Sequence, residues 1–319
     1  MSQQKHRPDA PSRRSFLTGS TALVAAATGL VGGAARADHH ELGRGHGVTN
    51  DGVKLSFIEK GKGQPLVLVP GWSQTAAMFK YQIDELSKQY RVIALDMRGH
   101  GDSAKPTHGY RIARLAHDLH DFLVGMDLKD IVLGGHSMGA SVIWSYWEQF
   151  DGARVSKLVL IDQAATVTVQ PGWTDADKAE TGAVFEPKAL FDTCAALAGP
   201  DGEKTTAGLV NGLFFTKQFP QDQLAWVLAE NLKMPRAHAA KLLADHCIQD
   251  WRDVIPRISV PTLVVGGEAS FFPPDSQLWI GRQISGSQVT IFGADEGGSH
   301  FMFLENPAFF NEVVAQFIG

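Results

Sequence analysis

The chain has 319 residues, with 29 Lys and Arg against 34 Asp and Glu, so its formal net charge is −5. The sequence has no strongly basic segment with interleaved aromatic residues, which excludes the usual electrostatic basis of nucleic-acid binding. A hydrophobic fraction of 44% is ordinary for a globular protein, and the length suffices for one large domain with an inserted subdomain.

The first 37 residues form a predicted export signal. Ser12-Arg13-Arg14-Ser15-Phe16-Leu17 precedes an apolar run of small residues at 18–35, and Ala35-Arg36-Ala37 matches an A-x-A cleavage site. This order is typical of a twin-arginine signal peptide. The run is only about 18 residues long and Gly-rich, which disfavours a membrane anchor. We therefore predict a mature chain that begins near Asp38, is periplasmic or secreted, and does not bind a membrane.

The segment that follows the signal is polar and contains three histidines. We predict that residues 38–47 form a flexible N-terminus. A metal-binding role for His39, His40 and His46 is the alternative, but a solvated tail is the favoured interpretation.

From Gly52 onward, strand patterns alternate with helix patterns. Alternation of apolar and polar residues predicts a strand at 53–57, and mainly apolar segments predict strands at 66–69, 91–95, 131–134, 157–161, 262–265 and 288–292. Helical patterns occur in four places: one ends near Gln89, one spans 111–126, one follows Gly139 and one spans 307–318. Continuous apolar strands that alternate with helices predict an α/β fold with a mostly parallel sheet and helices on both faces.

The alternation lapses between Asp162 and Pro261. Helical patterns recur there at about 187–198, 205–217, 221–231 and 235–247, together with Trp173, Trp226 and Trp251. We predict a helical cap at 163–256, inserted into an α/β core made of residues 38–162 and 257–319. An ordinary helical layer is the alternative, and in either case most of the aromatic residues are expected to pack within this segment.

One short stretch carries the strongest chemical signal. Gly135-His136-Ser137-Met138-Gly139 lies between a predicted buried strand and a predicted helix. Strand, G-x-S-x-G and helix together are typical of a nucleophile elbow, in which a sharp turn exposes the serine hydroxyl. Ser137 is therefore the candidate nucleophile. The Met138 N–H, at the start of the helix, is a candidate oxyanion donor.

Three further blocks follow the same order as in a known family: Val69-Pro70-Gly71-Trp72, Asp96-Met97-Arg98-Gly99-His100-Gly101-Asp102-Ser103 and Gly298-Ser299-His300-Phe301. With the elbow, they resemble the α/β-hydrolase superfamily, in its lid-bearing serine esterase and lactonase branch, over about Gly52 to Gly319. The resemblance implies a nucleophile at Ser137, a general base at His300 and a second oxyanion N–H at Trp72.

The sequence departs from the family pattern at two places. Pro70-Gly71 stands where His-Gly is usual, and Gly267-Glu268-Ala269-Ser270 stands where the family acid is usual. Some relatives carry the acid after the sixth strand instead, where this chain has Asp162, 162 − 137 = 25 positions after the serine. We predict Asp162 as the triad acid, with Glu268 and Asp275 as alternatives.

These residues predict acyl transfer on a small hydrophobic ester or lactone through an acyl-enzyme, without a cofactor or metal. No zinc-type His and Cys spacing or phosphate-binding loop is present in the sequence. A cofactor-free perhydrolase or haloperoxidase with the same triad is an alternative enzyme, and a ligand receptor with vestigial hydrolysis is a non-enzymatic one. The sequence leaves the oligomeric state open.

The only two cysteines, Cys194 and Cys247, lie in the predicted cap. Export permits a disulfide, which would close a loop of 247 − 194 = 53 positions. Folding in the reducing cytoplasm before export favours two free, buried thiols. Both alternatives remain open from the sequence.

Overall fold

The computed structural model describes residues 42–319. The predicted signal at 1–37, together with His39 and His40, lies outside the described residues. Within the described part, none of the helices combines the length and the apolar character that a membrane crossing requires.

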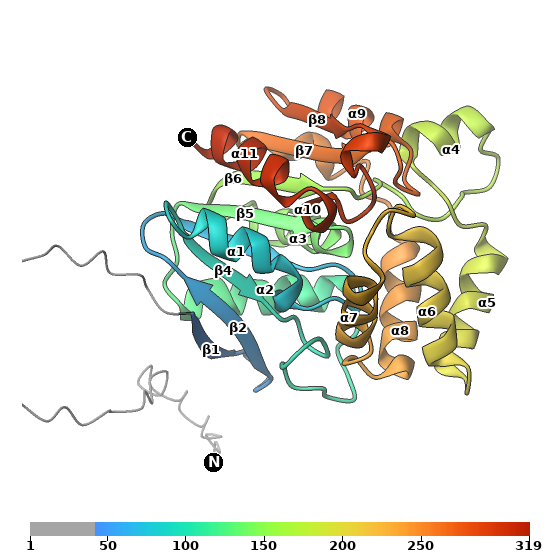
Figure 1. Cartoon of the computed structure of the whole chain (residues 1–319), viewed down its shortest axis with the longest axis horizontal. Helices are drawn as coiled ribbons and strands as arrows, with labels where there is room; N and C mark the ends of the chain where they lie inside the picture. The colour runs from blue at the N-terminus through green and yellow to red at the C-terminus, as the bar shows by residue number, and fades with distance from the viewer. Residues whose placement is uncertain (1–41) are drawn as a thin grey trace, which may run out of the picture. The chain divides into compact units, whose positions relative to one another are not determined.

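Eight strands form one sheet in the order β1-β2-β4-β3-β5-β6-β7-β8 (Figure 1). Strands β1 and β2 are antiparallel to their neighbours, and all other pairs are parallel, which confirms the predicted mostly parallel sheet. The strands span Gly43–Val48, Lys54–Lys60, Pro65–Val69, Arg91–Leu95, Ile131–His136, Val155–Ile161, Thr262–Gly267 and Gln288–Phe292.

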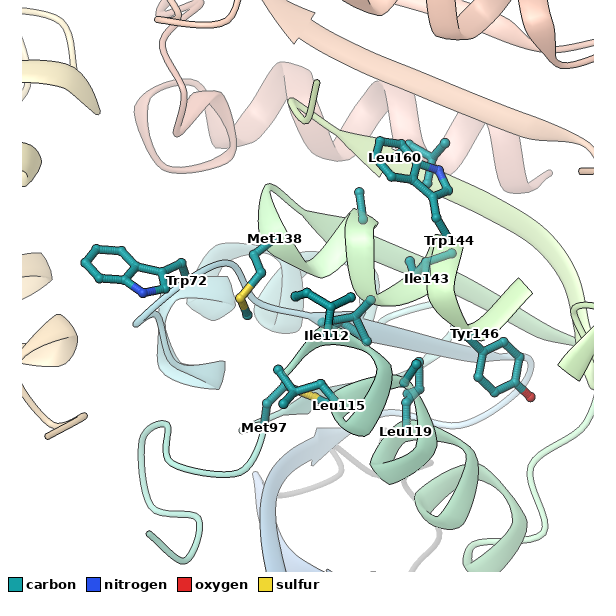
Figure 2. Close-up of a cluster of buried hydrophobic side chains, with 14 of the residues drawn as sticks. Trp72, Met97, Ile112, Leu115, Leu119, Met138, Ile143, Trp144, Tyr146 and Leu160 are labelled. Carbon is teal, nitrogen blue, oxygen red and sulfur yellow. The ribbon is translucent and has the colours of Figure 1, made fainter. Parts of the chain in front are cut away.

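Helices cover both faces of the sheet. One face packs against α1 (Lys80–Leu86), α10 (Met302–Glu305) and α11 (Pro307–Ile318), and the other against α2 (Ile112–Gly125), α3 (Met138–Phe150) and α9 (Pro274–Gln283). Successive side chains of a strand point to opposite faces, so Leu66 and Leu68 lie in the core on the side of α1, α10 and α11, whereas Val67 and Val69 lie in the core on the side of α2, α3 and α9. Figure 2 shows the core on the side of α2 and α3, where side chains of these two helices interdigitate.

Five helices lie between β6 and β7: α4 (Asp175–Thr181), α5 (Pro187–Ala198), α6 (Gly202–Leu213), α7 (Gln221–Asn231) and α8 (Arg236–Cys247). The predicted helices at 187–198, 221–231 and 235–247 match α5, α7 and α8 closely, whereas α6 begins and ends earlier than its predicted range. Helix α4 was not predicted, and it packs against α9. We call α5–α8 the helical insertion.

The helical insertion is joined to the loop that follows β3. The Trp72 Nε1–H donates to the Ala239 carbonyl at 2.7 Å, and the Ser73 hydroxyl donates to the Asn231 carbonyl at 2.8 Å. The Thr75 hydroxyl also donates to the Glu230 carboxylate at 2.6 Å. Helices α7 and α8 are therefore anchored beside the carboxyl ends of the central strands (Figure 1).

The prediction of a flexible segment up to Gly47 is wrong for its second half. Residues Gly43–Val48 form strand β1, which pairs with β2 from Gly43 opposite Glu59 to Val48 opposite Lys54. Gly45 lies against the Phe57 ring, where a Cβ would come within 2.3 Å of the ring. The glycines that make this segment look unstructured are thus what lets it pack against aromatic side chains.

A buried ion pair holds the loop after β4. The Arg98 side chain is fully buried and bonds Asp118, which is also fully buried, through Nε and through Nη2 at 2.7 Å. Arg98 Nη2 also contacts Asp51 at 3.0 Å. This arrangement makes Arg98 a structural residue.

Replacing Asp118 with alanine is expected to lower the free energy of unfolding by about 3–5 kcal/mol, because it leaves the Arg98 guanidinium buried and only partly paired. Urea denaturation followed by circular dichroism measures the change. Asp84→Ala is the matched control, since its pair with Lys60 is exposed and should contribute less than about 1 kcal/mol. Equal losses in the two variants would contradict the structural role of this pair.

Cys194 on α5 and Cys247 on α8 are both buried and free. Burial raises the pKa of each thiol, which keeps it protonated. Of the two alternatives that the sequence left open, a disulfide or two free thiols, the structure has the two free thiols.

Candidate active site

Ser137 lies at the sharp turn between β5 and α3. Its backbone has φ 52° and ψ −126°, a region that non-glycine residues rarely adopt, and its N–H is held by the Ile161 carbonyl at 2.8 Å. The flanking glycines allow the turn, since a Cβ on Gly139 would lie 2.3 Å from the Val69 carbonyl oxygen and one on Gly135 would meet the Gly139 backbone at 2.6 Å. The geometry is that of a nucleophile elbow.

His300 and Asp162 are hydrogen-bonded to each other. His300 lies in the loop between β8 and α10, and its Nδ1 is 2.6 Å from Asp162 Oδ2. Asp162 directly follows β6, also with a positive φ of 47°, and its N–H is held by the Val265 carbonyl at 2.7 Å. The structure thus brings together the predicted base and the predicted acid.

The other candidate acids do not contact His300. Glu268 is exposed and accepts from the Ala294 N–H at 3.1 Å, and Asp275 is exposed in the first turn of α9. Ser270, at the usual family position of the acid, donates its hydroxyl proton to Asp162 Oδ2 at 2.5 Å. The carboxylate that pairs with His300 therefore follows β6, and the serine at the usual place of the family acid donates a hydrogen bond to it.

The surroundings of the pair are dry and aromatic. The His300 ring packs against Phe214, Phe271 and Phe272, with ring centroids 5.3, 4.6 and 5.8 Å away. Burial lowers the pKa of His300, which favours a neutral imidazole able to accept a proton. Burial raises the pKa of Asp162, while the hydrogen bonds from Ser270 and from the Gly267 N–H oppose this shift.

Two backbone N–H groups beside the serine are free to bind an oxyanion. Within residues 42–319, neither the Trp72 N–H nor the Met138 N–H donates to a protein acceptor. The next residue, Ser73, has a positive φ of 61°. Its hydroxyl accepts a hydrogen bond from Arg236 Nη2 at 2.8 Å.

Several supporting residues were not predicted. His136, the variable residue of the G-x-S-x-G motif, is buried with Nε2 2.8 Å from the His300 carbonyl oxygen and Nδ1 2.8 Å from Gln74 Oε1. Gln74 Oε1 also accepts from the Gly71 N–H at 2.9 Å. His136 could have been considered because it lies inside the motif, whereas no local pattern marks Gln74 or Arg236.

Ser137 and His300 open into one cavity of about 190 Å³. They are not hydrogen-bonded to each other in this structure, and such contacts commonly tighten only when substrate binds. Val184 and Leu213 are the exposed parts of the lining, so the cavity opens to solvent beside them. The full lining is Trp72, Gln74, Ser137, Val167, Val184, Phe185, Leu209, Leu213, Phe214, Leu243, His246, Cys247, Phe271, Phe272 and His300.

Known proteins share this architecture. A curated relative, the AB hydrolase superfamily protein YisY of Bacillus subtilis, is 31% identical over 277 residues, which is 84% of this chain and 97% of that protein. A non-heme chloroperoxidase from Kitasatospora aureofaciens is 26% identical over 69% of this chain and 79% of its own length.

Among solved structures, an esterase from Exiguobacterium antarcticum superposes with a TM-score of 0.77 at 26% identity, covering 86% of this chain and 98% of the esterase. The family model described as the alpha/beta hydrolase fold matches residues 64–307, more than half of the sequence. The nucleophile-elbow geometry, the sheet topology and these matches together show that the chain belongs to the α/β-hydrolase family.

Proposed function

We propose that this protein is a serine hydrolase that cleaves a carboxylic ester or lactone of a small hydrophobic molecule. The observation that carries the proposal is the His300–Asp162 hydrogen bond of 2.6 Å beside Ser137, at the base of a cavity walled by apolar side chains. The cavity is smaller than the about 300–1,000 Å³ typical of sites for drug-sized ligands, which favours a small substrate.

The reaction begins when His300 Nε2 takes the Ser137 hydroxyl proton and Oγ attacks the carbonyl carbon. The N–H groups of Trp72 and Met138 stabilise the oxyanion. His300 then protonates the leaving alkoxide, and the C–O bond breaks to leave the acyl-enzyme. Water attacks the acyl-enzyme with His300 as base, which releases the acid and restores Ser137, while Asp162 holds the imidazole in the required tautomer.

The mature protein is expected to hydrolyse p-nitrophenyl esters with short acyl chains, because the cavity is small and apolar. A panel of p-nitrophenyl esters of increasing chain length, together with lactones, tests this expectation. A fluorophosphonate probe should label the wild type but not Ser137→Ala. Absence of both hydrolysis and labelling would favour a ligand receptor over an enzyme.

A second candidate, perhydrolysis, draws support from the chloroperoxidase relative. Hydrogen peroxide would replace water in the second step, so that the acyl-enzyme yields a peracid and free Ser137. Peracid formation at a rate above that of ester hydrolysis, with both rates lost in Ser137→Ala, would favour this activity. The predicted twin-arginine signal at residues 1–37 supports a periplasmic or secreted site of action for either reaction.

A further inference from the structure

Besides the candidate nucleophile Ser137, one polar side chain of the cavity has no hydrogen-bond partner among residues 42–319. His246 lies in the last turn of α8, is only 4% exposed and lines the same cavity as Ser137 and His300. The one amide side chain of the lining, Gln74, already accepts from the Gly71 N–H and contacts His136. Most of the remaining lining is aliphatic or aromatic, so His246 is a polar group in an apolar wall.

The two ring nitrogens of His246 differ in their surroundings. Nδ1 is buried and has no hydrogen-bond partner within residues 42–319. Nε2 has no hydrogen-bond partner within these residues either and is not buried, and because the residue lines the cavity, Nε2 is the nitrogen that can face it. Burial and, as a smaller cause, the nearby His300 lower the pKa of His246 to about 3, so the imidazole is neutral near pH 7.

A neutral imidazole carries one proton, and its position follows from these surroundings. Nδ1 lacks a partner in either tautomer, but a buried N–H without an acceptor is rarer in proteins than a buried acceptor without a donor, which favours the proton on Nε2. A proton on Nε2 points to the cavity, where a ligand atom can accept it. His246 therefore presents an N–H donor to whatever occupies the cavity.

Other histidines of the described chain do not combine these features. His100 is buried with an unpaired Nε2 but does not line the cavity. His238, also on α8, has an unpaired Nδ1, but it is only partly buried and stacks on Tyr110 with ring centroids 4.3 Å apart. Of these histidines, only His246 is both buried and part of the cavity lining with its ring nitrogens unpaired.

We propose that His246 binds a second oxygen atom of the substrate, through an Nε2–H hydrogen bond to a carbonyl, ether or hydroxyl oxygen remote from the scissile carbonyl. This inference rests on the proposed ester hydrolysis and narrows its substrate class. The substrate is a small ester or lactone that is hydrocarbon over most of its length and carries one additional oxygen acceptor. A purely aliphatic ester leaves the His246 donor unpaired and is a poorer substrate.

The test uses two matched series derived from p-nitrophenyl hexanoate and hexyl acetate, in which one chain CH₂ at a time, at least two carbons away from the ester group, is replaced by oxygen or carbonyl. In the wild type, kcat/KM for one position is expected to exceed that of the parent ester by about threefold to tenfold, the usual contribution of one neutral hydrogen bond. His246→Phe removes the donor and should abolish this preference. His246→Gln retains a side-chain N–H and should keep part of it.

His238→Phe is the matched control, because it makes the same change on the same helix outside the cavity, and it should leave the preference unchanged. Melting temperatures verify that each variant is folded. Binding of the same esters is measured by tryptophan fluorescence in the Ser137→Ala variant and in the double variant Ser137→Ala, His246→Phe. This comparison reports on His246 without any catalysis. The same preference should appear in these binding affinities.

Failure of the two proposals can be told apart. If the wild type hydrolyses none of the esters, the proposed function fails, and the binding series alone decides the role of His246. If no oxygenated ester is preferred in turnover or binding, or if His246→Phe leaves the preference intact, the assignment of His246 is overturned.

Discussion

Replacing Ser137 or His300 with alanine is expected to lower kcat for ester hydrolysis by at least about a thousandfold while leaving the fold intact. The reason is geometric, since Ser137 carries the only hydroxyl at the elbow turn and His300 is the imidazole paired with Asp162 beside it. A thousandfold loss corresponds to about 4 kcal/mol of transition-state stabilisation. Steady-state kinetics on the best ester of the panel measures it.

Ser141→Ala is the control for the serine variant. Ser141 lies one turn further along α3, is fully buried and has a hydroxyl without a partner in the described chain, so its removal should leave kcat within about threefold of the wild type. Most activity retained in purified, folded Ser137→Ala or His300→Ala would refute the assignment of the nucleophile or the base.

Asp162→Asn is expected to lower kcat by about a thousandfold to ten-thousandfold. Asp162 Oδ2 accepts hydrogen bonds from both His300 Nδ1 and the Ser270 hydroxyl. An asparagine N–H₂ in that place donates to Nδ1, which moves the imidazole proton to Nε2. His300 can then no longer accept the proton of Ser137.

The neighbouring acids and the exchanged serine supply the controls. Glu268→Gln and Asp275→Asn should leave kcat nearly unchanged, because both residues are exposed and neither contacts His300. Ser270→Ala should have a modest effect, because it removes one of the two hydrogen bonds to Asp162 Oδ2 without changing the partner of His300. A larger loss in Glu268→Gln than in Asp162→Asn would show that the acid lies elsewhere.

The sheet was predictable because its strands carry signals that do not depend on distant contacts. Segments such as 66–69 and 92–95 are continuous apolar runs, as expected for strands covered on both faces. The elbow was predictable because G-x-S-x-G between a strand and a helix imposes one backbone geometry. The prediction that Asp162 pairs with His300 required the additional observation that Ser270 stands at the usual place of the acid.

The remaining features depend on neighbours far away in the sequence. Strand β1 forms because Gly45 lies against Phe57 across a hairpin, and its own composition indicates a loop. Gln74 and His246 belong to the cavity because the fold places the loop after β3 and helix α8 side by side there, which the sequence around each residue does not indicate. Periodicity describes which face of a helix is apolar, but it does not tell which single polar residue on that face meets a cavity.

Four hydrogen bonds join the helical insertion to the loop at 72–75 and restrict how ligands exchange. A hinged opening of α7 and α8 would have to break all four, and with them the contacts that hold the loop at Trp72 and Ser73. Such an opening would therefore disturb the loop that carries the Trp72 N–H, the candidate oxyanion donor. Val184 and Leu213 are the exposed parts of the cavity lining, so a ligand that enters beside them does not have to break these hydrogen bonds.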